Sequence, residues 1–115
     1  MLTKEFNQKV IVGDDLYATN IKRLGDGINF HATNSALVKP NQIGTITDTV
    51  KFFMLARKSN MKTIFSHRSG ETDDNLLCHL AVGLGADYIK LGIAGERISK
   101  VNEMIRIEEM VKEQR

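Results

Sequence analysis

The sequence is short of several features that define whole classes of protein. Cys78 is the only cysteine, so the chain cannot form an internal disulfide, which is typical of a reducing compartment. No apolar run approaches the roughly 20 residues that a membrane-spanning helix needs, and residues 1–5 lack the apolar core of a signal peptide. We therefore expect a cytoplasmic protein without a transmembrane segment. Cys78 lies among apolar residues, which favours a packed thiol over a reactive one.

A large charge excess is also missing. The chain has 16 Lys and Arg residues against 14 Asp and Glu residues, a formal net charge of +2, and the basic residues are scattered. Nucleic acids and anionic membranes are usually bound by concentrated positive charge, so this balance argues against both as partners. The 115 residues, 42% of them hydrophobic, suffice for one small core, and no segment has the composition of a linker. We expect a single domain over residues 1–115.

What the sequence does contain is a fourfold alternation of apolar and amphipathic segments. Short apolar runs without polar alternation predict strands buried on both faces, and hence a parallel sheet in an α/β fold. The predicted strands are 10–12, 35–38, 62–66 and 88–91, and the predicted helices are about 21–29, 46–59, 73–83 and 98–110. Two architectures satisfy this pattern: an open four-stranded α/β sheet, or half of an eight-stranded α/β barrel.

Local signals mark some of the boundaries. Thr19-Asn20 predicts the N-cap of the first long helix, and Thr45 followed by Asp48 resembles a capping box. Pro40 is predicted to end the second strand.

A charged or polar residue follows each predicted strand. Parallel strands place their carboxyl ends at one edge of a sheet, so these residues are expected to form one rim, where α/β proteins bind ligands. Two lysines gathered there would repel each other unless an anion lay between them. The residues of this predicted carboxyl rim are Asp14, Lys39, the run His67-Arg68-Ser69, and Lys90.

The chemistry of the rim favours a small phosphorylated acid as ligand. Asp14 offers a hard oxygen ligand for Mg²⁺, while Arg68 and Ser69 suit a phosphate group. Lys39 and Lys90 could neutralise a carboxylate, or one of them could act as a base if neighbouring cations favour its neutral form. The plainer alternatives are a solvated basic turn at residues 66–72 and a capping or turn role for Asp14, whose role Asp15 could also take.

Four segments carry a resemblance to a known family. They are VGDDL at 12–16, KPNQIG at 39–44, SHRSGET at 66–72 and RIEE at 106–109. Together, and in this order, they resemble the carboxyl-terminal part of enolase, the phosphopyruvate hydratase of glycolysis. The resemblance covers nearly the whole chain, and it implies four parallel β/α units that form the C-terminal half of an enolase-type TIM barrel. Residues 1–115 would then be a single partial domain.

The resemblance also implies a role for individual residues. Lys39 is similar to the base that removes the proton from carbon 2 of 2-phosphoglycerate, and Asp14 to a ligand of the catalytic Mg²⁺. Loss of water then gives phosphoenolpyruvate, so the implied activity is that of a carbon–oxygen lyase. The substrate-binding residues implied by the resemblance are Lys39, Ser66, His67, Arg68, Ser69 and Lys90.

Family enolases are much longer, and the parts without a counterpart here supply two more acidic metal ligands, the glutamates tied to departure of the hydroxyl, and a loop that closes over the site. Mg²⁺ demands near-octahedral coordination, and one carboxylate binds it poorly. We therefore expect little or no activity from this chain alone. Open sheet edges invite pairing, so we expect a homo-oligomer or assembly with a complementing N-terminal enolase chain. The alternatives are a non-catalytic, enolase-derived interaction module or relic, and an independent phosphate-binding domain.

Overall fold

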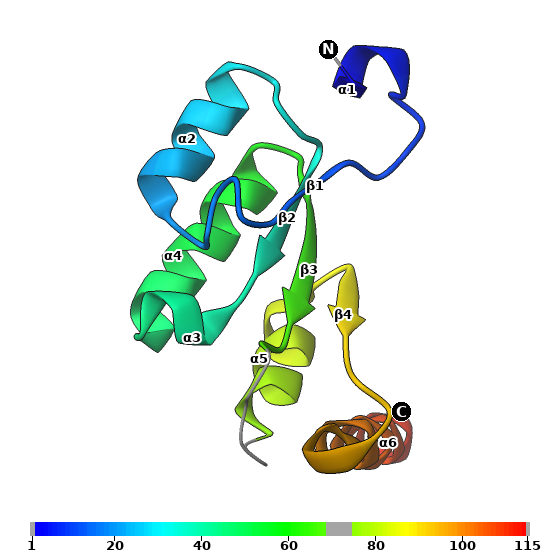
Figure 1. The fold of residues 1–115 in the computed structure, drawn as a ribbon. Coiled ribbons are helices and arrows are strands. Elements are labelled where there is room, and N and C mark those ends of the chain that lie inside the picture. Colours follow the sequence, from blue (N-terminus) through cyan, green and yellow to red (C-terminus); the bar gives the residue numbers. More distant parts are fainter. Residues whose placement is uncertain (1, 69–74, 115) are drawn as a thin grey trace.

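The computed structural model describes residues 2–68 and 75–114 (Figure 1). Its strands are β1 (Val12–Gly13), β2 (Ser35–Val38), β3 (Lys62–Ser66) and β4 (Tyr88–Lys90). Its helices are α1 (Leu2–Glu5), α2 (Ile21–Asn29), α3 (Pro40–Ile43), α4 (Ile46–Lys58), α5 (Leu76–Leu84) and α6 (Ile98–Glu113), with a 3₁₀ turn η1 (Gly95–Arg97) before α6. No helix within these described ranges has the length and apolar character that spanning a membrane requires.

The strands form one parallel sheet in the order β1-β2-β3-β4, which confirms the predicted α/β fold. Figure 1 shows β2, β3 and β4 pointing the same way, with α2 and α4 together on one side of the sheet. Helix α4 packs on β2 and β3, α2 packs on α4, and α5 packs on β3 and β4. Sequential parallel strands with their helices on one face are the arrangement of an α/β barrel wall, not of a doubly wound sheet.

The core lies between this one face of the sheet and the helices. Ala36 and Val38 of β2 and Phe65 of β3 are fully buried against Phe52 of α4 and Leu24 of α2. Because side chains alternate along a strand, Leu37 and Ile64, which are register partners, lie on the opposite face. That second face is the one that would line the interior of a barrel.

Two predicted caps are confirmed. The side chain of Asn20 accepts a hydrogen bond from Arg23 N, 3.1 Å away, at the start of α2. Thr45 Oγ1 accepts one from Asp48 N at 3.2 Å and donates to Asp48 Oδ2 at 2.8 Å, so Thr45 is the N-cap of α4. Thr19 is not part of the α2 cap and has another role, described below.

The first predicted strand is wrong in its extent. Only Val12 and Gly13 pair with β2, and Val10 and Val12 are 47% and 39% exposed, because β1 has a neighbour on one side only in the described chain. Pro40 ends β2 as predicted, but it also begins α3, where its fixed φ suits the first helical position.

Burial on both faces is confirmed for β2 and is wrong for β4. All four residues of β2 are buried, whereas Tyr88 is 49% exposed and Lys90 is also exposed. The reason is positional, since β4 is an edge strand whose second face has no covering layer within the described residues. The prediction of a packed thiol is confirmed: Cys78 is fully buried, its Sγ donates to Lys100 O at 3.3 Å, and burial raises the pKa of the thiol.

Polar contacts stabilise the amino end of the sheet and the packing of α5 against α6. Asp87, just before β4, accepts hydrogen bonds from Thr63 N at 2.8 Å and from Arg57 Nη1 at 3.2 Å, and the bond from Thr63 N is the main cause of its lowered pKa. Glu103 of α6 lies 2.8 Å from His79 Nε2 of α5 and accepts from Arg106. The hydrogen bond from Arg106, followed by that from His79, lowers the pKa of Glu103.

Candidate functional site

The described residues of the predicted rim lie at the carboxyl ends of the four strands. The register pairs Val38 with Phe65 and Ser66 with Lys90, so Lys39 follows the last paired residue of β2 at the level of Ser66 and Lys90. Neighbouring strands are about 4.8 Å apart, which places the backbones of Lys39 and Lys90 about 10 Å from each other. Alternation puts these three residues on the face opposite the helices. The prediction that parallel strands bring them to one level of the sheet therefore agrees with the register.

Asp14 and Lys39 are in direct contact. Lys39 Nζ lies 2.7 Å from Asp14 Oδ1, and the two side chains are 15% and 43% exposed. Strands β1 and β2 deliver them from positions 25 residues apart in the chain. The Lys39 side chain is therefore largely enclosed, whereas the Asp14 carboxylate is accessible to solvent and to a ligand.

The turn at residues 14–19 shapes this contact. Asp14 O accepts hydrogen bonds from Tyr17 N at 3.1 Å and from Ala18 N at 2.9 Å, so the turn closes on Asp14 itself. At its other end Thr19 is fully buried, and its Oγ1 accepts from Lys39 N at 3.1 Å and donates to Gln42 Oε1 at 2.7 Å. One short turn therefore holds Asp14 at one end and the backbone of Lys39 at the other.

Tyr17 anchors the same turn. Its ring is fully buried and its hydroxyl lies 2.6 Å from Thr33 Oγ1, which in turn donates to Ser35 O at 3.1 Å. The ring lies against Gly13 and Gly27, at both of which an added Cβ would overlap it. The absence of side chains at these two glycines leaves the space that the ring fills.

His67 is held by the neighbouring strand. Its Nδ1 lies 3.0 Å from the carbonyl oxygen of Lys90, which can only accept, so Nδ1 carries a proton, and in the matching neutral tautomer Nε2 is the acceptor atom of the ring. Ser66 is 1% exposed and donates to His67 O at 2.9 Å. The Ser66 hydroxyl therefore supports the backbone of the rim in this structure, and its substrate contact stays a prediction.

The remaining predicted residues are only partly described. Arg68 and Lys90 are exposed at the rim. Ser69 lies outside the described residues, as do Asp73 and Asp74, which were predicted to open the third long helix; the described part of that helix is α5.

A magnesium site is not complete in the described chain. Within residues 2–68 and 75–114, no three His, Cys, Asp or Glu side chains come together as metal ligands. Asp14 supplies one oxygen ligand and is shared with Lys39. Because Mg²⁺ holds its waters strongly and favours octahedral oxygen ligation, these residues do not fit a magnesium ion on their own.

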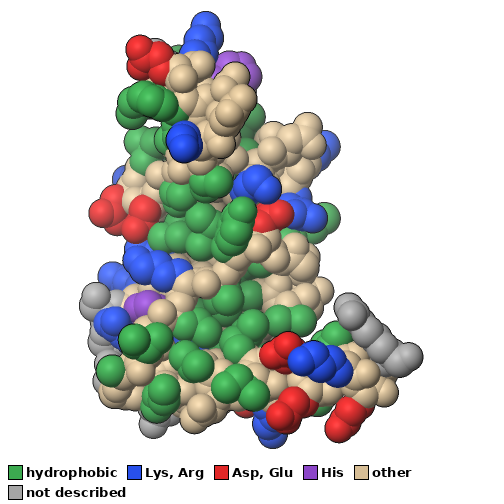
Figure 2. Space-filling model, turned by 90° about the vertical axis from the view of Figure 1, so that its right-hand side faces the viewer, with side chains coloured by type: hydrophobic (Ala, Val, Ile, Leu, Met, Phe, Trp, Pro, Cys, Tyr) green, Lys and Arg blue, Asp and Glu red, His purple; other side chains and the backbone are tan. Residues whose placement is uncertain are grey.

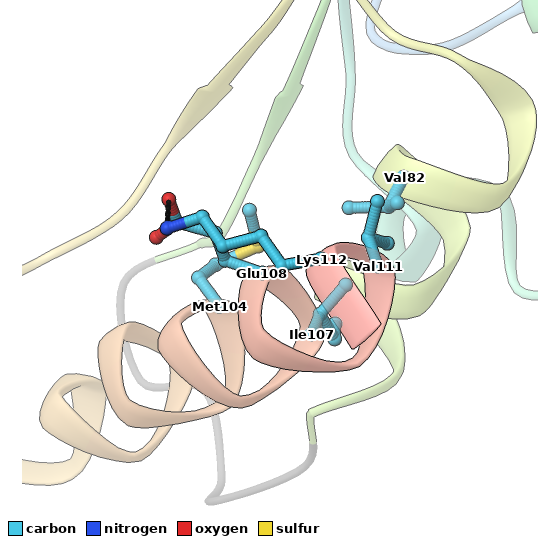
Figure 3. Close-up of a pocket in the computed structure, with 6 residues that line it drawn as sticks. All are labelled: Val82, Met104, Ile107, Glu108, Val111 and Lys112. Carbon is cyan, nitrogen blue, oxygen red and sulfur yellow. Dashed lines mark ion pairs between the residues drawn. The ribbon is translucent and has the colours of Figure 1, made fainter. Parts of the chain in front are cut away.

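A shallow groove of about 300 Å³ lies elsewhere, between α5 and α6 (Figure 3). Its lining contains no predicted site residue and consists of Val82, Met104, Ile107, Glu108, Val111 and Lys112. Glu108 and Lys112 pair with each other across 2.7 Å on α6, as the dashed line in Figure 3 marks. The groove thus shares no residue with the rim and presents no converging polar groups for catalysis.

The side of the molecule turned away from α2 and α4 is strongly apolar. Figure 2 shows hydrophobic side chains gathered in a band along this side, flanked by charged ones. The register places Leu37, Ile64 and Tyr88 in one row on the sheet face opposite the helices, where Leu37 is buried, Ile64 is half-buried and Tyr88 is 49% exposed. Such a face normally packs against another layer.

Sequence reasoning missed the residues that hold Asp14 and Lys39 in place. Thr19, Gln42 and Tyr17 were not predicted as site residues, because their partners lie 16 to 23 residues away in the chain. A possible signal was present for Tyr17 alone, as a large aromatic residue between glycines at 13 and 27.

Comparison with known proteins identifies the family of the chain. The family model described as "Enolase, C-terminal TIM barrel domain" matches residues 1–115. The chain is 52% identical over 105 residues to the enolase of Ureaplasma parvum serovar 3, covering 90% of this chain and 24% of the relative. It is 51% identical over 108 residues to the enolase of Picrophilus torridus, covering 93% and 27%.

A third relative gives the same picture. The enolase of Haloarcula marismortui is 53% identical over 104 residues, covering 90% of this chain and 26% of the relative. The chain spans about a quarter of the length of the curated relatives it matches. With four parallel strands in sequential order and the family's barrel model matched from end to end, this chain belongs to the enolase family and corresponds to the carboxyl-terminal part of its barrel domain.

Proposed function

We propose that this chain supplies the lysine-bearing wall of an enolase active site and that it catalyses the dehydration of 2-phosphoglycerate when the rest of the barrel is present. The observation that carries the proposal is the contact between Lys39 Nζ and Asp14 Oδ1 at 2.7 Å, on the rim where β1 and β2 end. An ammonium group enclosed along its stem and facing an accessible carboxylate suits a site that exchanges its partner for an anionic ligand.

In the proposed reaction Lys39, in its neutral form, takes the proton from carbon 2 of 2-phosphoglycerate. The electron pair left on carbon 2 forms the double bond to carbon 3 as the C3–O bond breaks. The hydroxyl leaves as water, protonated by an acid from the part of the barrel that this chain does not span. Arg68 and Ser69 would hold the phosphate, and Lys90 the carboxylate. His67, with its Nδ1 proton directed to Lys90 O, would present Nε2 to the ligand.

The proposal assigns only one ligand of a Mg²⁺ ion to this chain. A bound Mg²⁺ would neutralise charge that develops on the carboxylate. Asp14 is the one predicted ligand in this chain, so the remaining ligands would have to come from another part of the barrel.

The same incompleteness leads us to propose a partner. A closed α/β barrel has eight strands, whereas β1 and β4 each have one neighbour in the described chain. On the sheet face opposite the helices, Leu37 is buried, Ile64 is half-buried and Tyr88 is 49% exposed. Pairing of both edges with four further strands would bury the exposed part of this row. The proposed partner is a chain carrying the first half of an enolase barrel, with a second copy of this chain as the competing occupant.

A complementation experiment tests the function. The part of the Ureaplasma parvum enolase that this chain does not match is produced separately and mixed with this chain, 2-phosphoglycerate and Mg²⁺. We expect formation of phosphoenolpyruvate from the mixture and little or none from either chain alone, with a one-to-one complex in light scattering. In a matched control, a chimera carries this chain covalently in place of the relative's own segment.

The outcomes separate the two parts of the proposal. Turnover by the chimera but not by the mixture supports the site and contradicts assembly of separate chains. An inactive but folded chimera contradicts the proposed function and favours a non-catalytic interaction module. Robust turnover by this chain alone would contradict the need for a partner.

A further inference from the structure

Thr19 combines three features that seldom occur together. Its backbone φ is +49°, a value that is rare for a β-branched residue because the branched side chain crowds the backbone there. Its side chain is fully buried. Its hydroxyl is used twice, accepting from Lys39 N at 3.1 Å and donating to Gln42 Oε1 at 2.7 Å.

The backbone conformation alone would favour glycine or asparagine at this position. A threonine in an unfavourable conformation indicates that its hydroxyl makes interactions that outweigh the strain. The two hydrogen bonds identify this use, since both partners belong to the segment that carries Lys39: the first bond holds the amide of Lys39 itself, and the second holds Gln42 on α3, the short helix that Lys39 caps.

The other end of the same turn carries Asp14, whose carbonyl oxygen accepts from Tyr17 N and Ala18 N. Thr19 therefore joins the two strand ends whose side chains meet at 2.7 Å. We propose that Thr19 is a positioning residue: its hydroxyl fixes the backbone of Lys39 relative to Asp14 and so aims the lysine at the ligand.

This inference rests on the proposed function for its catalytic consequence, but not for its geometric content. Three replacements of Thr19 separate the effect of its hydroxyl from the effects of its volume and of its backbone conformation. Thr19→Val keeps the shape and removes the hydroxyl, Thr19→Ser keeps the hydroxyl, and Thr19→Gly removes the hydroxyl while tolerating the positive φ. If Thr19→Val fails to fold, Thr19→Gly answers the same question, because it lacks the hydroxyl without adding backbone strain.

The first measurement uses the isolated chain labelled with ¹⁵N and ¹³C. We expect nuclear Overhauser contacts between the Lys39 Hε and Asp14 Hβ protons in the unsubstituted chain and in Thr19→Ser. These contacts should be lost in Thr19→Val and Thr19→Gly, and exchange of the Lys39 amide proton should become at least about 10-fold faster, since its acceptor is gone. The amide of Lys62, which donates to Asn34 O at 3.1 Å, is the internal reference and should not change.

The second measurement uses the chimera. We expect kcat to fall about 10- to 100-fold in Thr19→Val, the loss typical of a misplaced catalytic group, with KM changed by less than about threefold and with Thr19→Ser close to the unsubstituted chimera. Persistence of the Lys39–Asp14 contacts in both Thr19→Val and Thr19→Gly would overturn the inference, as would an unchanged kcat. An inactive unsubstituted chimera would contradict the proposed function alone, because the resonance measurement decides the role of Thr19 without turnover.

Discussion

Replacing Lys39 by methionine is expected to lower kcat of the chimera by about 10²- to 10⁴-fold, the range usually found when a general base is removed. Methionine keeps most of the length of the side chain and removes the ammonium group that faces Asp14. The fold should survive, because Asp14 is 43% exposed and water can solvate the carboxylate once its partner is gone. The loss should therefore appear in kcat, with the thermal unfolding midpoint little changed.

Lys62→Met is the matched control for this replacement. Lys62 begins β3 at the opposite end of the sheet, where its Nζ lies 5.8 Å from the centre of the Tyr88 ring. The two variants change the same charge on the same sheet, but only Lys39 lies at the carboxyl rim. Equal activity of the two variants would contradict the assignment of Lys39 as the base.

Alanine at Gly27 is expected to destabilise the chain strongly, whereas alanine two residues earlier, at Gly25, should stabilise it. A Cβ on Gly27 would lie 2.5 Å from the hydroxyl oxygen of Tyr17 and 2.7 Å from its Cζ. The ring has no room to retreat, because it is fully buried and its hydroxyl is bonded to Thr33. Overpacking of this kind costs about 1–3 kcal/mol of unfolding free energy.

Gly25 lies in the same helix, and a Cβ there would meet no atom within 4 Å. Gly25→Ala should therefore gain helix propensity, about 0.5–1 kcal/mol. Urea denaturation of both variants measures the difference in unfolding free energy, which we expect to be about 1.5–4 kcal/mol from the sum of these two effects. Shifts of the same sign in both variants would show that the Tyr17 ring does not fill the space beside Gly27.

The parts of the fold that the sequence predicts well are those fixed by local pattern and burial. Strands β2 and β3 have their predicted bounds. Each lies between two other strands, so its surroundings are the buried ones that its apolar pattern predicts. Strand β1 was predicted at 10–12, because the apolar side chains of Val10 and Ile11 are typical of a buried strand. In the structure only Val12 and Gly13 pair with β2. Local composition carries no information on where a sheet ends.

The site divides in the same way. That Asp14 and Lys39 lie at neighbouring strand ends follows from parallel strands alone, and their contact agrees with it. Thr19 was predicted as part of a helix cap, since its side chain suits that role locally. Its actual partners are 20 and 23 residues away, and neither the positive φ nor the distant hydrogen bonds leave a trace in the local sequence.

The most direct test of the shared carboxyl rim is a titration of the isotopically labelled chain with 2-phosphoglycerate, followed by NMR. We expect saturable shifts with one common dissociation constant at Asp14, Lys39, His67 and Lys90, which belong to four different strand ends. Asp87, which is bonded to Thr63 at the opposite edge of the sheet, should not respond. Shifts confined to a single strand end, or centred on the groove between α5 and α6, would contradict a common binding site at the rim.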